Sequence, residues 1–223
     1  MRDYTSYSDS ELIEKAKHGE DVAFGELVSR YEQQVAGIVK GMLGDNAAAE
    51  DVGQETFIRF YRSLEKFRGD SALGTYITRI AINLSLNEIK KQKKVISLFY
   101  SRDDEEKEFD VPEEKSHEDE SDTKELVDKA LLALKPEFRS VVVLRMIQGY
   151  STKEAASILN VPGGTILSRL ARAQKELRKI LEPFVSKSEE QRAKNEEQRT
   201  KNKCMEKMRT SNQKLTTNTI YYD

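Results

Sequence analysis

Three polar side chains between residues 50 and 67, in the segment EDVGQETFIRFYRSLEKF, have the spacing of one helix face. Asp51, Gln54 and Glu55 fall at i, i+3 and i+4, so a helix brings two carboxylates and an amide together. Such a cluster can accept bidentate hydrogen bonds from arginines of another protein. An ordinary hydrophilic helix face has the same spacing, and the spacing alone favours that simpler interpretation. The residues predicted to lie on other parts of the helix are Val52, Thr56, Arg59 and Tyr61.

A second candidate site is a loop followed by a lysine-rich helix, FRGDSALGTYITRIAINLSLNEIKKQKK at 67–94. The loop, Phe67–Thr75, contains two glycines and can wrap an unstacked base, while the lysines at the end of the helix can hold phosphates. The alternative is a plain connection between two helices, with lysines that complement the helix dipole. The residues by themselves leave these two interpretations balanced.

The third candidate is GYSTKEAASILNVPGGTILSRLARAQKELRKIL, residues 149–181, which predicts a helix-turn-helix. Ser151 and Glu154 have capping-box spacing, and Asn160–Gly164 forms a turn because proline and glycine do not continue the first helix. A new helix can start at about Pro162, with an apolar stripe on one side and cations and a hydroxyl largely off it. This pattern favours DNA binding over a plain helical hairpin. The stripe is Ile166, Leu170, Ala173, Leu177 and Ile180/Leu181, and the residues off it are Ser168, Arg169, Arg172, Lys175 and Lys179.

Helical periodicity on both sides of residue 100 predicts an all-α fold, because no alternating strand pattern of useful length occurs. In the first half we expect helices at about 8–18, 20–43, 46–67 and 72–94. In the second half a helix starts near residue 124, and Pro136 sits in the first turn of the next. The residues of that helix predicted to face inward are Val142, Val143, Leu144 and Ile147.

Charge is distributed unevenly, although the net charge is only −2. Residues 101–123 hold 12 acidic and three basic residues, whereas residues 124–185 hold 11 basic and six acidic ones. The acidic block has too few apolar residues to fold by itself, so it predicts a flexible, self-repelling linker between two small helical domains. The expected boundaries are a first domain at 1–98, the linker at 99–123, the helix-turn-helix domain at 124–185 and a polar, disordered tail at 186–223.

Several classes of protein are disfavoured by composition. One cysteine and two distant histidines leave no disulfide, zinc site or Ser-His-Asp set, and we expect no metal and no cofactor. No apolar run is long enough for membrane insertion, and residues 1–12 lack a signal-peptide core, so a cytoplasmic location is expected.

The three segments, in this order, resemble bacterial RNA polymerase sigma factors of the extracytoplasmic-function group. The motifs that carry the resemblance are AEDVGQETFIRFYRSLEKFRGDSALGTYITRIAINL and STKEAASILNVPGGTILSRLARAQKEL, and it extends from about Ser8 to Leu181. The resemblance implies a protein that binds core RNA polymerase and directs promoter-specific initiation. It would read the minus-thirty-five element as duplex and the minus-ten element as melted strand. Implied partners are core RNA polymerase, promoter DNA and an anti-sigma factor; the chemistry belongs to polymerase, so the chain is not expected to be an enzyme.

The resemblance also implies three sets of site residues. The docking set, which would grip the clamp helices of the large polymerase subunit, is Asp51, Gln54, Glu55, Phe57 and Arg59. The minus-ten set, whose loop would capture a flipped base and whose helix would guide the strand, is Arg68, Gly69, Asp70, Ser71, Thr75, Tyr76, Arg79, Asn83, Lys90 and Lys91. The minus-thirty-five set, which would contact bases and phosphates, is Lys153, Thr165, Ser168, Arg169 and Arg172.

The chain departs from the family pattern at two positions. Many members carry a basic residue where this chain has Leu167, and often a bulkier one at Ala171. The contacts to the minus-thirty-five element are therefore expected to be fewer, or to differ in base preference. Two alternatives compete with the resemblance. An independent helix-turn-helix regulator predicts tight operator binding without polymerase, and a helical nuclease predicts metal-dependent turnover. The sigma-factor interpretation is favoured over both.

Overall fold

A computed structural model describes residues 4–67, 69, 72–99 and 120–184. Every regular element in these residues is a helix, which confirms the all-α prediction. α1 (Asp9–Lys17) begins at the predicted capping box: Ser8 Oγ accepts from the Glu11 amide at 3.4 Å, and the Glu11 carboxylate accepts from the Ser8 amide at 2.7 Å. No helix in the described part of the chain is both long and apolar enough to cross a membrane.

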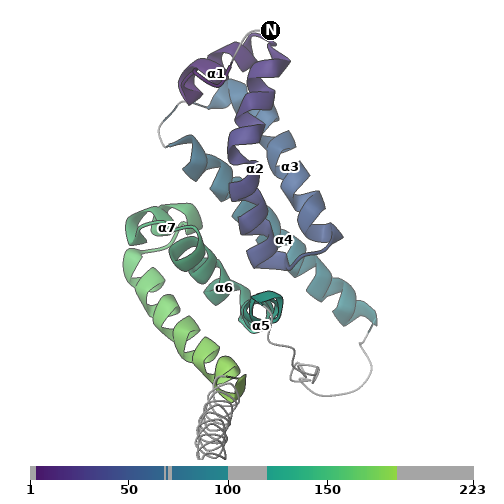
Figure 1. Ribbon diagram of the computed structural model, residues 1–223, viewed down its shortest axis with the longest axis vertical. Coiled ribbons are helices and arrows are strands. Elements are labelled where there is room, and N and C mark those ends of the chain that lie inside the picture. Colours follow the sequence, from purple (N-terminus) through teal and green to yellow (C-terminus); the bar gives the residue numbers. More distant parts are fainter. Residues whose placement is uncertain (1–3, 68, 70–71, 100–119, 185–223) are drawn as a thin grey trace, which may run out of the picture. The chain divides into compact units, whose positions relative to one another are not determined.

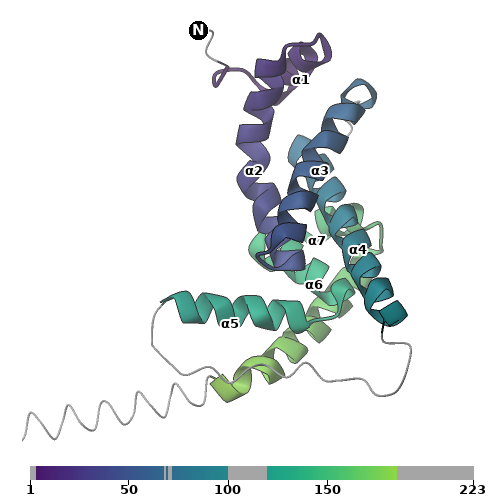
Figure 2. The same ribbon diagram turned by 90° about the vertical axis from the view of Figure 1, so that its right-hand side faces the viewer.

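Three long helices, α2 (Asp21–Leu43), α3 (Ala47–Ser63) and α4 (Leu73–Phe99), run beside one another in the first half of the chain (Figure 1). Each buries one apolar stripe in a shared core and leaves its polar side exposed. α1 packs against α2, as the second view shows (Figure 2). The largest fully buried side chains of this part are Leu12, Leu27, Ile38, Met42, Phe60, Ile77 and Ile82.

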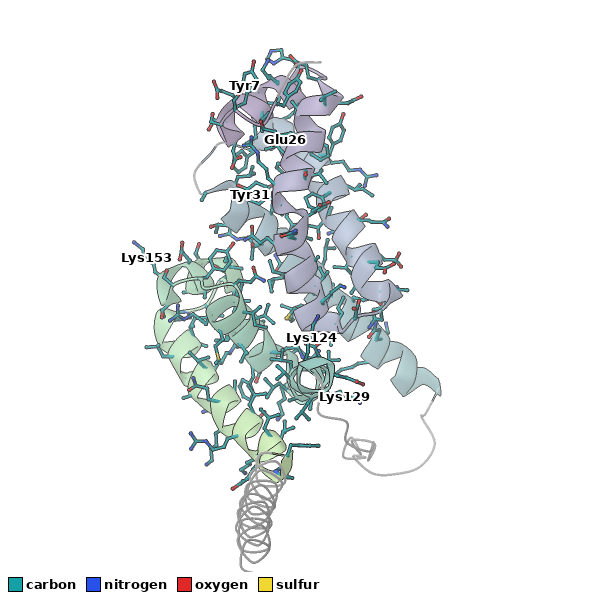
Figure 3. All side chains as sticks on the ribbon, in the orientation of Figure 1. Tyr7, Glu26, Tyr31, Lys124, Lys129 and Lys153 are labelled. Carbon is teal, nitrogen blue, oxygen red and sulfur yellow. The ribbon has the colours of Figure 1, made fainter. Side chains whose placement is uncertain are left out.

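Polar contacts fix α1 against α2. Arg30 bridges Asp9, with Nη1 3.0 Å from Oδ1, and Glu26, with Nε 2.9 Å from Oε1. The Tyr31 hydroxyl also donates to Asp9, and burial raises the pKa of Tyr31 well above its usual value, with the Asp9 hydrogen bond contributing. The labelled side chains of Glu26 and Tyr31 come from the same helix, α2 (Figure 3).

The predicted ends of two helices shift in the structure. The α-helix expected over 46–67 stops at Ser63 and tightens into a 3₁₀ turn, η1 (Leu64–Lys66), whose Leu64 is buried. Further along, α4 continues to Phe99, beyond the expected end at residue 94.

The second half contains α5 (Glu120–Ala133), α6 (Pro136–Val142), the π-helical segment η2 (Val143–Ile147), α7 (Thr152–Leu159) and a helix over 163–184. Pro136 occupies the first turn of α6, as predicted. α5 begins at Glu120, which lies inside the linker range expected from composition. Most of that range, 100–119, and the tail from 185 lie outside the described residues.

Ile147 was predicted to face inward, and this prediction is wrong. Val142, Val143 and Leu144 are buried, but Ile147 is 48% exposed. The reason is the π-helical turn, in which the Gln148 amide donates to the Val143 carbonyl at 2.9 Å, five residues back. The wider turn changes the helical phase. Gln148 lies against α2, where a Cβ on Gly37 would be 2.9 Å from its Nε2, and Ile147 touches α2 with its tip, Cδ1 being 3.8 Å from a Cβ placed on Gly41.

The helices of the two predicted domains contact each other within one compact unit, Met1–Leu177. The most buried polar link is Arg139 of α6, which is 8% exposed. Its Nη1 donates to the carbonyl of Met42 at 2.6 Å, and its Nη2 donates to that of Leu134 at 3.0 Å and to that of Leu132. Burial lowers the pKa of Arg139 to about 10, which leaves the guanidinium charged at neutral pH.

We expect Arg139→Met to lower the free energy of unfolding by about 2 kcal/mol or more, because buried carbonyl oxygens lose charged donors. Urea denaturation followed by circular dichroism measures the loss. Arg62→Met, at an exposed position of α3, is the matched control and should change stability little. Equal stability of the two variants would show that the bonds of Arg139 only offset its desolvation.

Candidate nucleic-acid and protein interfaces

The acidic cluster of α3 lies on the side opposite the core. Asn46 starts the helix, with its side-chain oxygen accepting from the Ala49 amide at 3.1 Å. Asp51 and Gln54 are exposed and Glu55 is half-exposed, whereas Ala49, Val52, Thr56 and Phe60 are buried. The three polar groups of the cluster are therefore presented together to solvent, with the spacing expected from the sequence.

The docking set contains two further residues, Arg59 and Phe57. Arg59 was predicted to point elsewhere, but its Nε donates to Oε1 of Glu55 at 2.8 Å. Residues four apart are neighbours on a helix, so Arg59 belongs to the same surface and partly neutralises it. Phe57 is half-buried and packs against the core, which gives it a supporting position beneath this surface.

Ile58 is a surface residue that the sequence analysis missed. It is 44% exposed and follows Gln54 by four residues, so an apolar side chain sits among the polar groups of the cluster. A single exposed apolar residue is common on protein surfaces, so Ile58 by itself does not identify a contact surface. The helical spacing of Ile58 from Asp51 and Gln54 was the signal available in the sequence.

The glycine-containing loop is only partly described. Gly69 is exposed with φ of +76°, a conformation that glycine adopts without strain, while Arg68, Asp70 and Ser71 lie outside the described residues. Gly74 and Thr75, expected in the loop, belong to the first turn of α4. The rings of Phe67 and Tyr76, on either side of the loop, lie 5.0 Å apart and anchor its two ends to the core.

The remaining residues of the minus-ten set form one stripe along α4. Tyr76, Arg79, Asn83 and Lys90 follow each other at spacings of three, four and seven, which places them on one side of the helix. Asn83, Lys90 and Lys91 are exposed, and Lys91 Nζ lies 3.4 Å from Glu88 Oε2.

Arg79 differs from the rest of the stripe because it is engaged within the protein. Its Nη2 donates to both the carbonyl oxygen and Oγ of Ser157 in α7, each at 3.0 Å. Nearby, the Tyr150 hydroxyl lies 2.6 Å from Gln34 Nε2, 2.7 Å from Thr78 Oγ1 and 3.3 Å from the Gly74 carbonyl. These contacts hold α4 and the start of the helix-turn-helix together.

The first helix of the helix-turn-helix starts and ends at specific residues. Both bonds of the predicted Ser151–Glu154 capping box are present, and the hydrogen bonds from Ser151 hold the pKa of Glu154 below its usual value. Asn160 ends α7 in the left-handed conformation, with φ of 52° and ψ of 49°. Asparagine tolerates this conformation better than most residues.

The second helix starts close to the position predicted, about Pro162, but the two glycines belong to this helix rather than to the turn before it. The next helix starts at residue 163, so Gly163 and Gly164 lie in its first turn, and Asn160 supplies the left-handed residue. The amides of Thr165 and Ile166 bond to the Pro162 carbonyl at 2.9 and 3.3 Å, which closes this first turn.

The helix over 163–184 presents the minus-thirty-five set on its outer side. Ile166 and Ala173 are fully buried, which sets the rotation of the helix. Ser168 and Arg172 are exposed, whereas Thr165 and Arg169 are half-buried. Ser168 Oγ donates to the Thr165 carbonyl at 3.1 Å, so its hydroxyl is held near the helix start.

Two more positions complete the outer surface of the helix-turn-helix. Lys153 is exposed and extends outward from α7 (Figure 3). Leu167 is 56% exposed on the next helix, although it is a large apolar residue.

Comparisons with known proteins match both halves of the chain. The model of Sigma-70 region 2 matches residues 27–95, and that of Sigma-70 region 4 matches residues 124–177. The RNA polymerase sigma-H factor of Pseudomonas aeruginosa is 32% identical over 190 residues, covering 81% of this chain and 97% of that protein. The ECF RNA polymerase sigma-E factors of Haemophilus influenzae and Escherichia coli K12 are 32% and 31% identical over 187 residues, covering 80% of this chain and 97% and 96% of theirs.

Two solved structures share the fold. CnrH, in complex with the cytosolic domain of CnrY, has a TM-score of 0.56 and 23% identity, covering 78% of this chain and 97% of that one. The sigma factor RpoE of Bartonella quintana, in complex with the anti-sigma factor NepR, has a TM-score of 0.58 and 22% identity, covering 71% and 96%.

The left-handed conformation of Asn160 is testable by a pair of substitutions. We expect Asn160→Ala to lower the free energy of unfolding by about 1–2 kcal/mol, because a Cβ without a local polar partner disfavours this conformation. Asn160→Gly should cost far less, since glycine adopts it freely. Urea denaturation of both variants measures the difference. Equal losses of unfolding free energy in the two variants would show that the asparagine side chain, rather than the left-handed backbone conformation, is responsible for the effect.

Proposed function

The chain belongs to the extracytoplasmic-function group of bacterial RNA polymerase sigma factors, which direct transcription initiation. From this premise we propose that it joins core RNA polymerase to promoter DNA through three surfaces. The observation that supports this best is the separation of buried and exposed stripes on α3, α4 and the helix over 163–184. Each of these helices packs by one side and offers a distinct set of polar groups on the other.

The first surface is the docking surface, formed by Asp51, Gln54, Glu55, Ile58 and Arg59. Two carboxylates and an amide suit bidentate pairing with arginines of the polymerase clamp helices. Ile58 adds an apolar contact in the middle of these polar groups. The Arg59–Glu55 pair keeps the Glu55 carboxylate oriented before docking. Phe57 supports this surface from below.

The second surface is the stripe of α4, which we propose binds the melted strand of the minus-ten element. The loop before α4 captures one unstacked base, and this contact offsets part of the few kcal/mol, by order of magnitude, that unstacking costs. Lys90 and Lys91 lie at the far end of the stripe and hold phosphates. Arg79 can serve this strand only after its Nη2 leaves Ser157, so strand binding and release of that contact are coupled.

The third surface is the outer side of the helix-turn-helix, which we propose reads the minus-thirty-five duplex. Ser168 and Arg172 face outward and Lys153 adds a phosphate contact from α7, with Thr165 and Arg169 at the edge. The segment between α4 and α5, which falls within the linker predicted at 99–123, would join the two DNA-binding parts, so two weak DNA contacts act at high effective concentration on one polymerase. An anti-sigma factor is the expected regulatory partner.

In vitro transcription with core polymerase and a promoter library tests the docking surface. We expect Asp51→Ala, Gln54→Ala and Glu55→Ala together to reduce specific transcripts at least tenfold at limiting protein, because the arginine-pairing groups are gone. Glu32→Ala with Gln33→Ala, which removes a carboxylate and an amide from exposed positions of α2, is the matched control. Unchanged initiation by the triple variant would remove the docking assignment. Operator binding without polymerase would instead favour an independent regulator.

Salt dependence tests the lysines of α4. Removing one cation that neutralises a phosphate should reduce the slope of log affinity against log salt by roughly 0.7–0.9. We therefore expect Lys90→Ala with Lys91→Ala to flatten the salt dependence of open-complex formation by about 1.4–1.8. Lys124→Ala, at an exposed position of α5, should leave the slope unchanged. A slope unaffected by the double change would show that these lysines bind no phosphate.

A further inference from the structure

One row of the helix over 163–184 lacks polar side chains although it faces solvent. Gly164, Leu167 and Ala171 follow each other at spacings of three and four, and all three are exposed. Leu167 is the prominent member of this apolar row. It lies beside a second row, Ser168, Arg172 and Lys175, that carries hydroxyl and cationic groups.

The rotation of the helix keeps Leu167 outside the core. Ile166 and Ala173 are buried completely, and Ala173 packs in a cluster with Leu131, Leu134 and Phe138. Turning Leu167 inward would expose these residues, so the exposure of Leu167 is a consequence of the packing. A Cβ placed on Gly164 would meet no other heavy atom within 4 Å, so the space beside the row is open.

The charges around the row indicate what approaches it. Residues 163–175 contain three cations, Arg169, Arg172 and Lys175, and no acidic residue. A polyanion is therefore attracted to this side of the helix. Duplex DNA combines such charge with one apolar group that is accessible in the major groove, the C5-methyl of thymine.

We propose that Leu167, flanked by Gly164 and Ala171, contacts a thymine methyl group in the minus-thirty-five duplex and so determines specificity there. This inference rests on the proposed function. The apolar row discriminates thymine from other pyrimidines by the methyl group alone, while Ser168 and Arg172 supply the polar contacts beside it. The small Gly164 and Ala171 let the base edge approach the helix closely.

Deoxyuridine provides the sharpest test because it differs from thymidine only by that methyl. A promoter is first selected from a random library by the holoenzyme, and each upstream thymine is then replaced by uracil, one at a time. We expect open-complex formation to fall about fourfold at one or two positions, the effect of burying one methyl group. Leu167→Ala should abolish this difference, so that thymine and uracil templates become equivalent.

Met146→Ala is the matched control, since Met146 is similarly exposed at 57% but lies in η2. It should keep the full thymine-to-uracil ratio. The thermal midpoint of Leu167→Ala should equal that of the wild type, because an exposed side chain is removed.

Three results would overturn the inference while leaving the proposed function intact, provided that wild-type initiation remains promoter-specific. The first is that no upstream thymine is sensitive to uracil. The second is that Leu167→Ala retains the thymine-to-uracil ratio. The third is that Leu167→Ala weakens binding to core polymerase without changing that ratio, which would make the row a protein contact. Failure of the wild type to initiate specifically would instead contradict the proposed function itself.

Discussion

A single buried guanidinium imposes the strictest requirement on this structure. Arginine remains charged at neutral pH, and a charge removed from water is tolerated only when its donors are satisfied. Arg139 satisfies its two terminal nitrogens with carbonyl oxygens of Met42, near the end of α2, and of Leu132 and Leu134, around the end of α5, while its buried Nε has no hydrogen-bond partner among the described residues. These carbonyls lack helical partners or carry the negative end of a helix dipole, so a cation suits them. The position of α6 is thereby tied to two other helices.

The placement of α6 has consequences for everything that follows it in the chain. The π-helical turn of η2 follows α6 directly and brings Gln148 against α2. Tyr150 then reaches Gln34 and Thr78, and the capping box at Ser151 starts α7 immediately afterwards. A helix-turn-helix held in this way presents its second helix outward, with Ile166 and Ala173 buried beneath it.

The proposed function depends on side chains that do not contribute to the core. On α3, burial of Val52, Thr56 and Phe60 leaves the acidic cluster outside. On the helix over 163–184, burial of Ile166 and Ala173 leaves Leu167 exposed. In the proposed function, this large apolar side chain contributes to binding only by contacting an apolar group of the ligand. Arg79 is the exception, because it is already bonded to Ser157 and, in the proposed function, has to exchange that contact for the strand.

Local patterns in the sequence determined where helices start and which sides of them are apolar. Capping boxes at Ser8 and Ser151, proline at residue 136 and regular apolar spacing act over a few residues, so they are visible without a structure. The cluster of Asp51, Gln54 and Glu55 is visible for the same reason. Tertiary structure alone decided the π turn that exposes Ile147 and the partners of Arg79 and Arg139. These depend on residues far apart in the chain or on small backbone adjustments that optimise packing, and no local spacing encodes either.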